Sequence, residues 1–154
     1  MDLESVAQLR DHAFTRGLSE PQIASLATLA HAVTFEENDL ILVDGQHSKS
    51  FYLVVSGSVS VELKTAHYMV GLQSLERHAA FGWSALLDDQ DTLFQVRARE
   101  RTQALQFEGV RLKALCRADP VLGVEILQRA LLMAAGRLKA TETRFAEMCG
   151  IKVQ

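Results

Sequence analysis

The fold is decided by residues 51–63, which read FYLVVSGSVSVEL. The first half of this stretch is a continuous apolar run, which the pair Ser56-Gly57 then interrupts. In the second half, apolar side chains occupy every other position from Val59 to Leu63. In a β-strand, successive side chains point to opposite faces, so apolar residues at every second position share one face. The glycine marks a turn between strands. The stretch therefore predicts two β-strands separated by a tight turn.

Similar short runs on both sides extend the strand-rich region over residues 32–107. Val33 and Phe35 alternate with polar neighbours, and the apolar run from 40 to 43 is closed by an Asp-Gly pair. Residues 93–107 alternate more loosely, and residues 84–87 read as one short helical turn. Many short strands separated by glycine turns are typical of a β-sandwich or a β-barrel.

Helical segments flank the strands. Residues 1–31 carry apolar side chains at helical spacing, and Ser19 with Gln22 forms a capping-box pattern. After the strands, Asp119-Pro120 reads as an N-cap followed by a proline in the first helical turn. We therefore expect N-terminal helices within residues 1–31 and a long helix over residues 119–149.

The long helix carries two apolar stripes. The first follows alternating steps of three and four residues, which is the spacing of a seam between two helices. Its members are Val124, Leu127, Leu131, Ala134, Leu138, Thr141, Phe145 and Met148. A second stripe, from Leu122 through Ile126 and Ala130 to Met133, faces elsewhere and is expected to cover the strands. We expect a homodimer through the first stripe; the alternative is one broad stripe buried within a single chain.

Five segments occur in the order found in one known family. They are residues 14–19 (FTRGLS), 35–41 (FEENDLI), 44–45 (DG), 51–59 (FYLVVSGSV) and 81–87 (FGWSALL). Over residues 14–138 the sequence resembles the cyclic nucleotide-binding domain family, seen in the bacterial catabolite activator protein and in kinase regulatory subunits. The resemblance implies an α+β fold, with a β-barrel of the jelly-roll (double-stranded β-helix) type, N-terminal helices and a long C-terminal helix. Asn38 stands where the family usually has glycine, and asparagine tolerates a left-handed backbone.

By the same resemblance, residues 81–94 form the phosphate-binding cassette. The family's cassette offers backbone N–H groups, an arginine that pairs with the phosphate and a glutamate that accepts the ribose hydroxyl. In this sequence Trp83 stands at the glutamate position and Thr92 at the arginine position, while His78 replaces an upstream glycine. The candidate ligand-binding residues are Phe81, Gly82, Trp83, Ser84, Ala85, Thr92 and Leu93.

These replacements predict a degenerate cassette. Losing a charge-assisted pair with phosphate weakens binding by about 10²- to 10³-fold. We therefore expect no tight binding of cAMP or cGMP in the family's usual mode, and no other cofactor. Trp83 and Phe94 are expected to fill the vacated space; the alternative for Trp83 is that it stacks on a flat ligand.

The remaining reactive residues form no catalytic or metal-binding pattern. The sequence has no Walker loop, no nucleophile elbow and no zinc-like spacing of histidine and cysteine. Arg97 is a candidate replacement cation, but strand alternation directs it toward solvent, and residues 88–91 read as a solvated loop. A haem ligand among the five histidines or at Cys116 stays open as an alternative. Otherwise Cys116 is expected to be buried and Cys149 exposed.

Composition bounds the function classes. The 154 residues predict one domain, 1–154, and the net charge of −3 offers no basic surplus for nucleic acid. Residues 151–154 are too few for a DNA-binding element, and neither an export signal nor a membrane span is visible, so we expect a cytoplasmic protein without direct DNA binding. The expected function is a non-enzymatic regulatory or sensor module that acts through an unknown effector protein. The alternative is a ligand-free dimeric scaffold.

Overall fold

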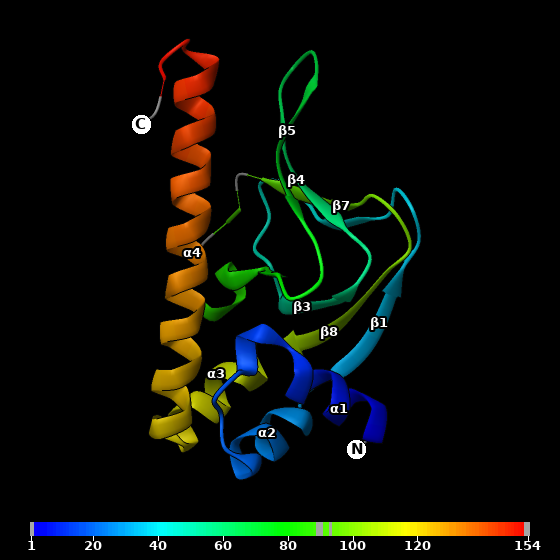
Figure 1. Ribbon diagram of the computed structural model, residues 1–154, viewed down its shortest axis with the longest axis vertical. Helices are drawn as coiled ribbons and strands as arrows, with labels where there is room; N and C mark the ends of the chain where they lie inside the picture. Colours follow the sequence, from blue (N-terminus) through cyan, green and yellow to red (C-terminus); the bar gives the residue numbers. More distant parts are fainter. Residues whose placement is uncertain (1, 89–90, 93, 153–154) are drawn as a thin grey trace.

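The computed structural model describes residues 2–88, 91–92 and 94–152 (Figure 1). Helices α1 (Leu3–Asp11) and α2 (Glu20–Ala27), with the 3₁₀ turn η1 (Ala13–Thr15) between them, precede the strands. Helices α3 (Gly109–Ala118) and α4 (Pro120–Met148) follow the strands. Figure 1 shows α4 running along one side of the molecule, with the N-terminal helices and α3 gathered near its first turns.

The strands form two sheets that pack face to face. Those within the described residues are β1 (His31–Phe35), β2 (Leu40–Leu42), β3 (Ser50–Ser56), β4 (Val59–Lys64), β5 (Met69–Leu75), β6 (Ala80–Phe81), β7 (Gln95–Ala98) and β8 (Thr102–Glu108). Their antiparallel orders are β1-β8-β3-β6 and β2-β7-β4-β5. The predicted α+β fold, with N-terminal helices and a long C-terminal helix, is confirmed. The described strands form ladders only within each sheet, so the two sheets are not closed into a barrel.

The stretch that decides the fold crosses from one sheet to the other. β3 pairs with β8 and β6, whereas β4 pairs with β5 and β7, so Gly57 lies at the crossing. Its φ is +85°, and a Cβ atom there would lie 2.5 Å from the carbonyl oxygen of Arg101. Glycine satisfies both the left-handed backbone and this close approach.

Two hydrophobic cores lie on the two faces of β3. Phe51 and Leu53 point toward the helices, where the ring of Phe51 lies 5.2 Å from that of Phe14. Tyr52 and Val54 point into the space between the sheets and belong to the second core. Burying a large apolar side chain stabilises the fold by about 1.5–3 kcal/mol. Alternation along one strand therefore attaches its sheet to the helices on one face and to the other sheet on the opposite face.

Several local predictions are confirmed. The capping box is present, with Gln22 N–H donating to Ser19 Oγ and the Ser19 N–H donating to Gln22 Oε1. Asn38 has a left-handed φ of +73°, as expected for a residue at a glycine position. His78, also expected at a glycine position, has a φ of +71°. Neither residue is glycine, but both positions have the left-handed backbone that a glycine there would adopt.

Helix α4 presents both predicted stripes. Leu122, Ile126 and Ala130 are buried in the core beneath the helices. The seam residues Val124, Leu127, Leu131, Leu138 and Phe145 are 49–70% exposed, and Ala134 and Thr141 are partly exposed. The alternative of one broad buried stripe is therefore wrong. Although α4 has 29 residues, no helix among the described residues combines the length and apolarity needed to cross a membrane.

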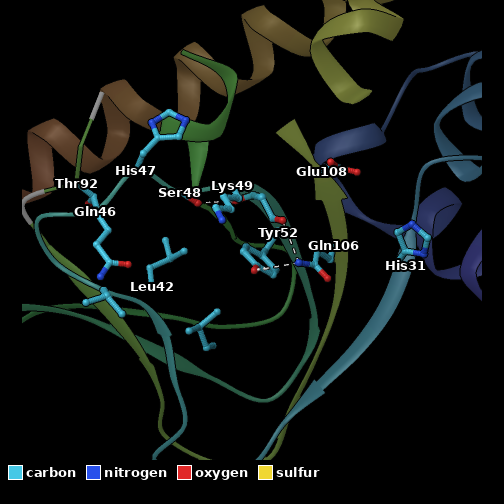
Figure 2. Close-up of a pocket in the computed structure, with 13 residues that line it drawn as sticks. His31, Leu42, Gln46, His47, Ser48, Lys49, Tyr52, Thr92, Gln106 and Glu108 are labelled. Atoms are coloured by element: carbon cyan, nitrogen blue, oxygen red, sulfur yellow. Dashed lines mark hydrogen bonds between the residues drawn. The ribbon is translucent and has the colours of Figure 1, made fainter. Parts of the chain in front are cut away.

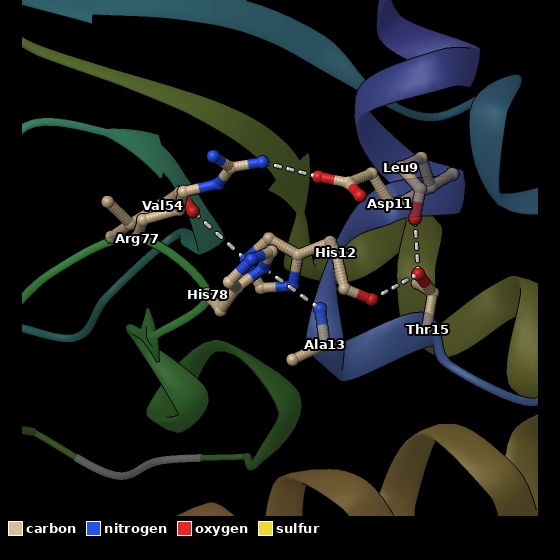
Figure 3. A network of polar contacts seen from close by, with 8 residues as sticks. All are labelled: Leu9, Asp11, His12, Ala13, Thr15, Val54, Arg77 and His78. Carbon is tan, nitrogen blue, oxygen red and sulfur yellow. Dashed lines mark hydrogen bonds and ion pairs between the residues drawn. The ribbon is translucent and has the colours of Figure 1, made fainter.

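A histidine pair links the N-terminal helices to the turn before β6 (Figure 3). His12 Nδ1 accepts the N–H of Phe14 at 3.1 Å, so Nε2 carries the proton and donates to the carbonyl oxygen of Val54 at 3.0 Å. His78 Nδ1 accepts the N–H of Ala13 at 3.2 Å. Burial lowers the pKa of His12 from 6.5 to about 4, because the charged ring would lose its hydration. The folded state therefore holds His12 neutral.

The free energy of unfolding is expected to fall as the pH drops from about 6.5 to about 4. In this window the unfolded chain protonates His12 while the folded chain resists protonation. The stabilisation is complete above pH 6.5 and is lost toward pH 4, by about 2–3 kcal/mol. Urea unfolding at a series of pH values measures the effect. His12→Gln should flatten this pH dependence, whereas the exposed His67→Gln should not; an unchanged dependence in His12→Gln would contradict the assignment.

Candidate functional site

The cassette segment begins where β6 ends. Phe81 is fully buried, and its ring stacks on that of Tyr52 with centroids 4.8 Å apart. Gly82 follows with a left-handed φ of +80°, and Trp83–Leu86 forms a single 3₁₀ turn, η2. Residues 84–86 are buried. The predicted ligand residues from 81 to 85 therefore share one tight turn.

Gly82 brings the cassette backbone directly against β3. A Cβ atom at Gly82 would lie 2.4 Å from the carbonyl oxygen of Ser50 and 3.3 Å from Ser48 Oγ. A side chain at this position would therefore push the cassette away from the strand, in addition to straining the left-handed backbone. The family-like glycine has a structural role whether or not a ligand binds.

Trp83 is partly exposed at the surface. Its side chain is 37% exposed, and among the described residues neither hydrophobic core includes it. Trp83 follows the left-handed Gly82 at the start of η2, and its role in filling the vacated space stays a prediction. Phe94 does pack against the core between the sheets, as expected.

Thr92 uses its hydroxyl within its own loop. Oγ1 donates to the carbonyl oxygen of Phe94 at 2.9 Å and accepts the N–H of Phe94 at 3.3 Å. Its backbone pairs with the preceding loop, since Gly45 N–H donates to the Thr92 carbonyl and Thr92 N–H donates to the Gln46 carbonyl. The residue at the family's arginine position therefore closes a local turn.

The acidic loop beyond η2 is solvated where the structure describes it. Asp88 and Asp91 are exposed, and the carboxylate of Asp88 lies 2.6 Å from the Lys113 ammonium. Leu93, a predicted ligand residue, lies outside the described residues, as do positions 89 and 90 of the predicted loop. Sequence reasoning missed Lys113, which lies on α3, 25 residues away along the chain.

A cleft of about 620 Å³ opens between the two sheets (Figure 2). Ile41, Leu42 and Val43 give it an aliphatic wall, and Thr92 lines it from the cassette. The other lining residues are polar or aromatic: His31, Gln46, His47, Ser48, Lys49, Ser50, Tyr52, Gln106 and Glu108. This volume falls within the range of small-molecule sites, which combine apolar walls with a few placed polar groups.

A polar triad lines the cleft on the inner face of the first sheet. Gln106 Nε2 donates to Ser50 Oγ at 2.9 Å and to the Tyr52 hydroxyl at 3.2 Å. Ser50 and Tyr52 are each only 7% exposed. Burial raises the pKa of Tyr52, and its polar neighbours Ser50 and Gln106 oppose this only in part. Sequence reasoning missed the triad, although polar residues at inward positions of two strands were a visible signal.

Two arginines near the site are already engaged. Arg97 lies on the outer side of its sheet, where Nε is 3.4 Å from Glu62 Oε2 and Nη1 donates to the Asn38 carbonyl at 3.0 Å. The expectation that Arg97 points away from the interior is therefore confirmed. Arg137 of α4 was missed: its Nη2 donates to the Ala80 carbonyl at 2.6 Å, and burial lowers its pKa to about 10. It connects α4 to the residue before the cassette.

The histidine, cysteine and acidic side chains are dispersed where the structure describes them. Within residues 2–88, 91–92 and 94–152, no three histidine, cysteine or acidic side chains converge on a common point. Cys116 is partly buried, less than expected, and burial raises the pKa of its thiol. Cys149 is exposed, as predicted. A thiol with a raised pKa carries less thiolate, the form that reacts and binds metals.

The family model of the cyclic nucleotide-binding domain matches residues 32–119, more than half of the chain. The chain belongs to the cyclic nucleotide-binding domain family. The match to this cyclic nucleotide-binding domain family spans most of both sheets and the whole cassette segment. No curated protein sequence matches the chain.

Solved structures agree with this fold. A cyclic nucleotide-binding domain from Methylobacillus flagellatus matches with a TM-score of 0.80 and 16% identity, over 94% of this chain and 82% of that one. The regulatory subunit of a cAMP-independent protein kinase A from Trypanosoma brucei gives 0.74 and 15%, over 93% and 50%. The catabolite activator protein of Thermus thermophilus gives 0.71 and 20%, over 88% and 62%. Identities this low establish the shared fold alone.

Replacing Gly82 tests the contact that positions the cassette of this cyclic nucleotide-binding domain. Gly82→Ala should lower the free energy of unfolding by about 2–4 kcal/mol, because backbone strain adds to a collision with Ser50. Gly45→Ala is the matched control, since Gly45 has a φ of +72° but no atom within 4 Å of the position that a methyl group would take. It should lose only about 1–2 kcal/mol. Urea unfolding measures both, and equal losses would show that the close contact is unimportant.

Proposed function

We propose that this chain is a non-enzymatic regulatory module whose cassette does not bind cAMP or cGMP in the mode that the family resemblance implies. The observation that carries the proposal is Thr92, which stands at the phosphate-binding position and has its hydroxyl bonded to Phe94. The guanidinium groups of Arg97 and Arg137 are engaged with Glu62 and with a backbone carbonyl. Desolvating a phosphate without a cation carries a large penalty.

Similar proteins make this proposal reasonable. The Trypanosoma brucei regulatory subunit is described as belonging to a cAMP-independent kinase. A triple mutant of that subunit, in which one change is threonine to arginine, is described as bound to cAMP. By analogy, adding the missing arginine and glutamate to this chain should create affinity for a cyclic nucleotide.

Titration calorimetry with cAMP and cGMP tests the altered cassette. The wild-type chain should bind neither more tightly than about 1 mM, while Trp83→Glu combined with Thr92→Arg should bind cAMP at least about 10²-fold more tightly. A matched control combines Trp83→Glu with Gln103→Arg, which adds the same charges but places the arginine on an exposed position of β8. A micromolar constant for the wild-type chain would refute the proposal.

Dimerisation through α4 is the second part of the proposed function. The seam from Val124 to Phe145 leaves large apolar side chains in water, although the opposite stripe of the same helix is buried. An exposed apolar stripe at heptad spacing is typical of a helix–helix interface. Arg137 lies on this helix and binds the Ala80 carbonyl, so a shift of the cassette would be transmitted to the dimer interface.

Sedimentation of two matched variants tests the dimer. The wild-type chain should sediment as a dimer at micromolar concentration, and Leu131→Glu should weaken association by at least about 10²-fold, because it buries a carboxylate in the seam. Leu132→Glu is the control, since Leu132 is 72% exposed but lies off the seam. It should leave the dimer intact. A monomeric wild-type chain, or equal effects of the two changes, would exclude this interface.

The proposed output is an interaction with an effector protein in the cytoplasm. The net charge of −3 is unsuited to direct binding of DNA, and both cysteines are free, as is usual in a reducing compartment. The second candidate function is a ligand-free dimeric scaffold. It is favoured by the stacked Tyr52 and Phe81 rings and by Phe94, which occupy much of the space between the sheets.

A further inference from the structure

The polar triad in the cleft has hydrogen-bonding capacity that the protein does not use. Both N–H donors of Gln106 are taken by Ser50 and Tyr52. Even with the Ser50 proton turned toward Tyr52, the Tyr52 proton and Gln106 Oε1 have no protein partner among the described residues. A buried hydroxyl is costly to leave unpaired, and Gln106 is only partly buried and lines the cleft, so its amide oxygen is open to a ligand there. The triad therefore presents one donor and one acceptor, side by side, to the cleft.

The charges around the cleft favour a neutral occupant. The triad itself is uncharged near neutral pH, because serine and glutamine do not ionise and a tyrosine hydroxyl is protonated there; burial raises the pKa of Tyr52 further. At the rim, Lys49 and Glu108 carry opposite charges, and both are exposed. The aliphatic wall of residues 41–43 would not stabilise an ion. These features differ from the anion-binding chemistry that the family's cassette uses.

We propose that this cleft binds a small, neutral, planar molecule with an amide or lactam edge. Its carbonyl oxygen would accept the proton of Tyr52, and its adjacent N–H would donate to Gln106 Oε1, while its ring would lie against Leu42 and its neighbours. The site adjoins the cassette, because Thr92 lines it and the Tyr52 ring stacks on Phe81. A molecule bound in this cleft would be the ligand that the regulatory module senses, so this proposal rests on the proposed function.

NMR titration of the full chain with three probes tests the ligand class. The probes are 2-pyridone, which has the lactam edge; N-methyl-2-pyridone, which lacks the N–H; and benzoate, an anion of similar size. 2-Pyridone should give saturable shifts of the Gln106 side-chain amide at low-millimolar concentration, as expected for so small a ligand. N-methyl-2-pyridone and benzoate should each bind at least about fivefold more weakly, since one hydrogen bond is lost or a charge is desolvated.

Matched variants test whether Tyr52 and Gln106 bind the ligand. Tyr52→Phe keeps the ring that stacks on Phe81 and should weaken 2-pyridone binding by about five- to tenfold. Tyr68→Phe makes the same change at a residue that is 66% exposed and should have no effect. If Tyr52→Phe fails to fold, Gln106→Met with its control Gln103→Met replaces it. Equal binding by the variants and their controls would overturn the proposal.

The outcomes also separate this proposal from the proposed function. Failure of 2-pyridone to bind, or equal binding of its N-methyl analogue, overturns the ligand class and leaves the altered cassette and the dimer standing. Displacement of 2-pyridone by micromolar cAMP would overturn both, because a cyclic nucleotide would then be the ligand of the interior. Saturable binding of 2-pyridone that cAMP does not compete supports both.

Discussion

Strand β3 packs its alternate side chains into two different cores, and the positions of the cassette and the cleft depend on this arrangement. Phe51 and Leu53 attach the strand to the helices, while Tyr52 and Val54 attach it to the second sheet. A shift of one residue in register would exchange these faces and place each set in the core that fits the other. The same strand supplies the Ser50 carbonyl that lies against Gly82, and the hydroxyls of Ser50 and Tyr52 that face the cleft.

From this constraint follows a division of roles within the site. The cassette keeps the backbone that a family member needs, with Gly82 left-handed and Phe81 stacked on Tyr52. The uncharged residues Trp83 and Thr92 stand where the family resemblance places a glutamate and an arginine, and the Thr92 hydroxyl is bonded within its own loop. The interior next to it offers hydroxyl and amide groups instead. Arg137 joins the residue before the cassette to α4, and this gives a physical path from the interior to the exposed seam.

Local sequence patterns predicted local structure well. The strands around Gly57, the capping box at Ser19 and the left-handed Asn38 all follow from the properties of neighbouring residues. The apolar periodicity of α4 predicted which stripe is buried and which is exposed. That the two sheets are not closed into a barrel could not be predicted, because strand periodicity specifies faces and leaves open which edges pair. The partial exposure of Trp83 depends on how η2 packs, which residue size does not reveal.

The sequence alone could not predict the cleft, because its polar residues come together only in the folded chain. Tyr52 and Gln106 are 54 residues apart, and only the pairing of β3 with β8 places them opposite each other. The contact between Ala13 and His78 spans 65 residues and likewise exists only in the folded chain. In the sequence, Gln106 is one polar residue among the loosely alternating positions of its strand. A contact between side chains on distant strands depends on the register in which the strands pair, and no single segment of the sequence specifies that register.

The central claim is that the interior takes a neutral ligand while the cassette takes no cyclic nucleotide. A crystal structure of the wild-type chain grown with equal concentrations of 2-pyridone and cAMP tests it most directly. The account predicts electron density for 2-pyridone bonded to Tyr52 and Gln106, with no nucleotide on the backbone of Ser84 and Ala85. Density for cAMP on that backbone, with the cleft free of 2-pyridone, would contradict it.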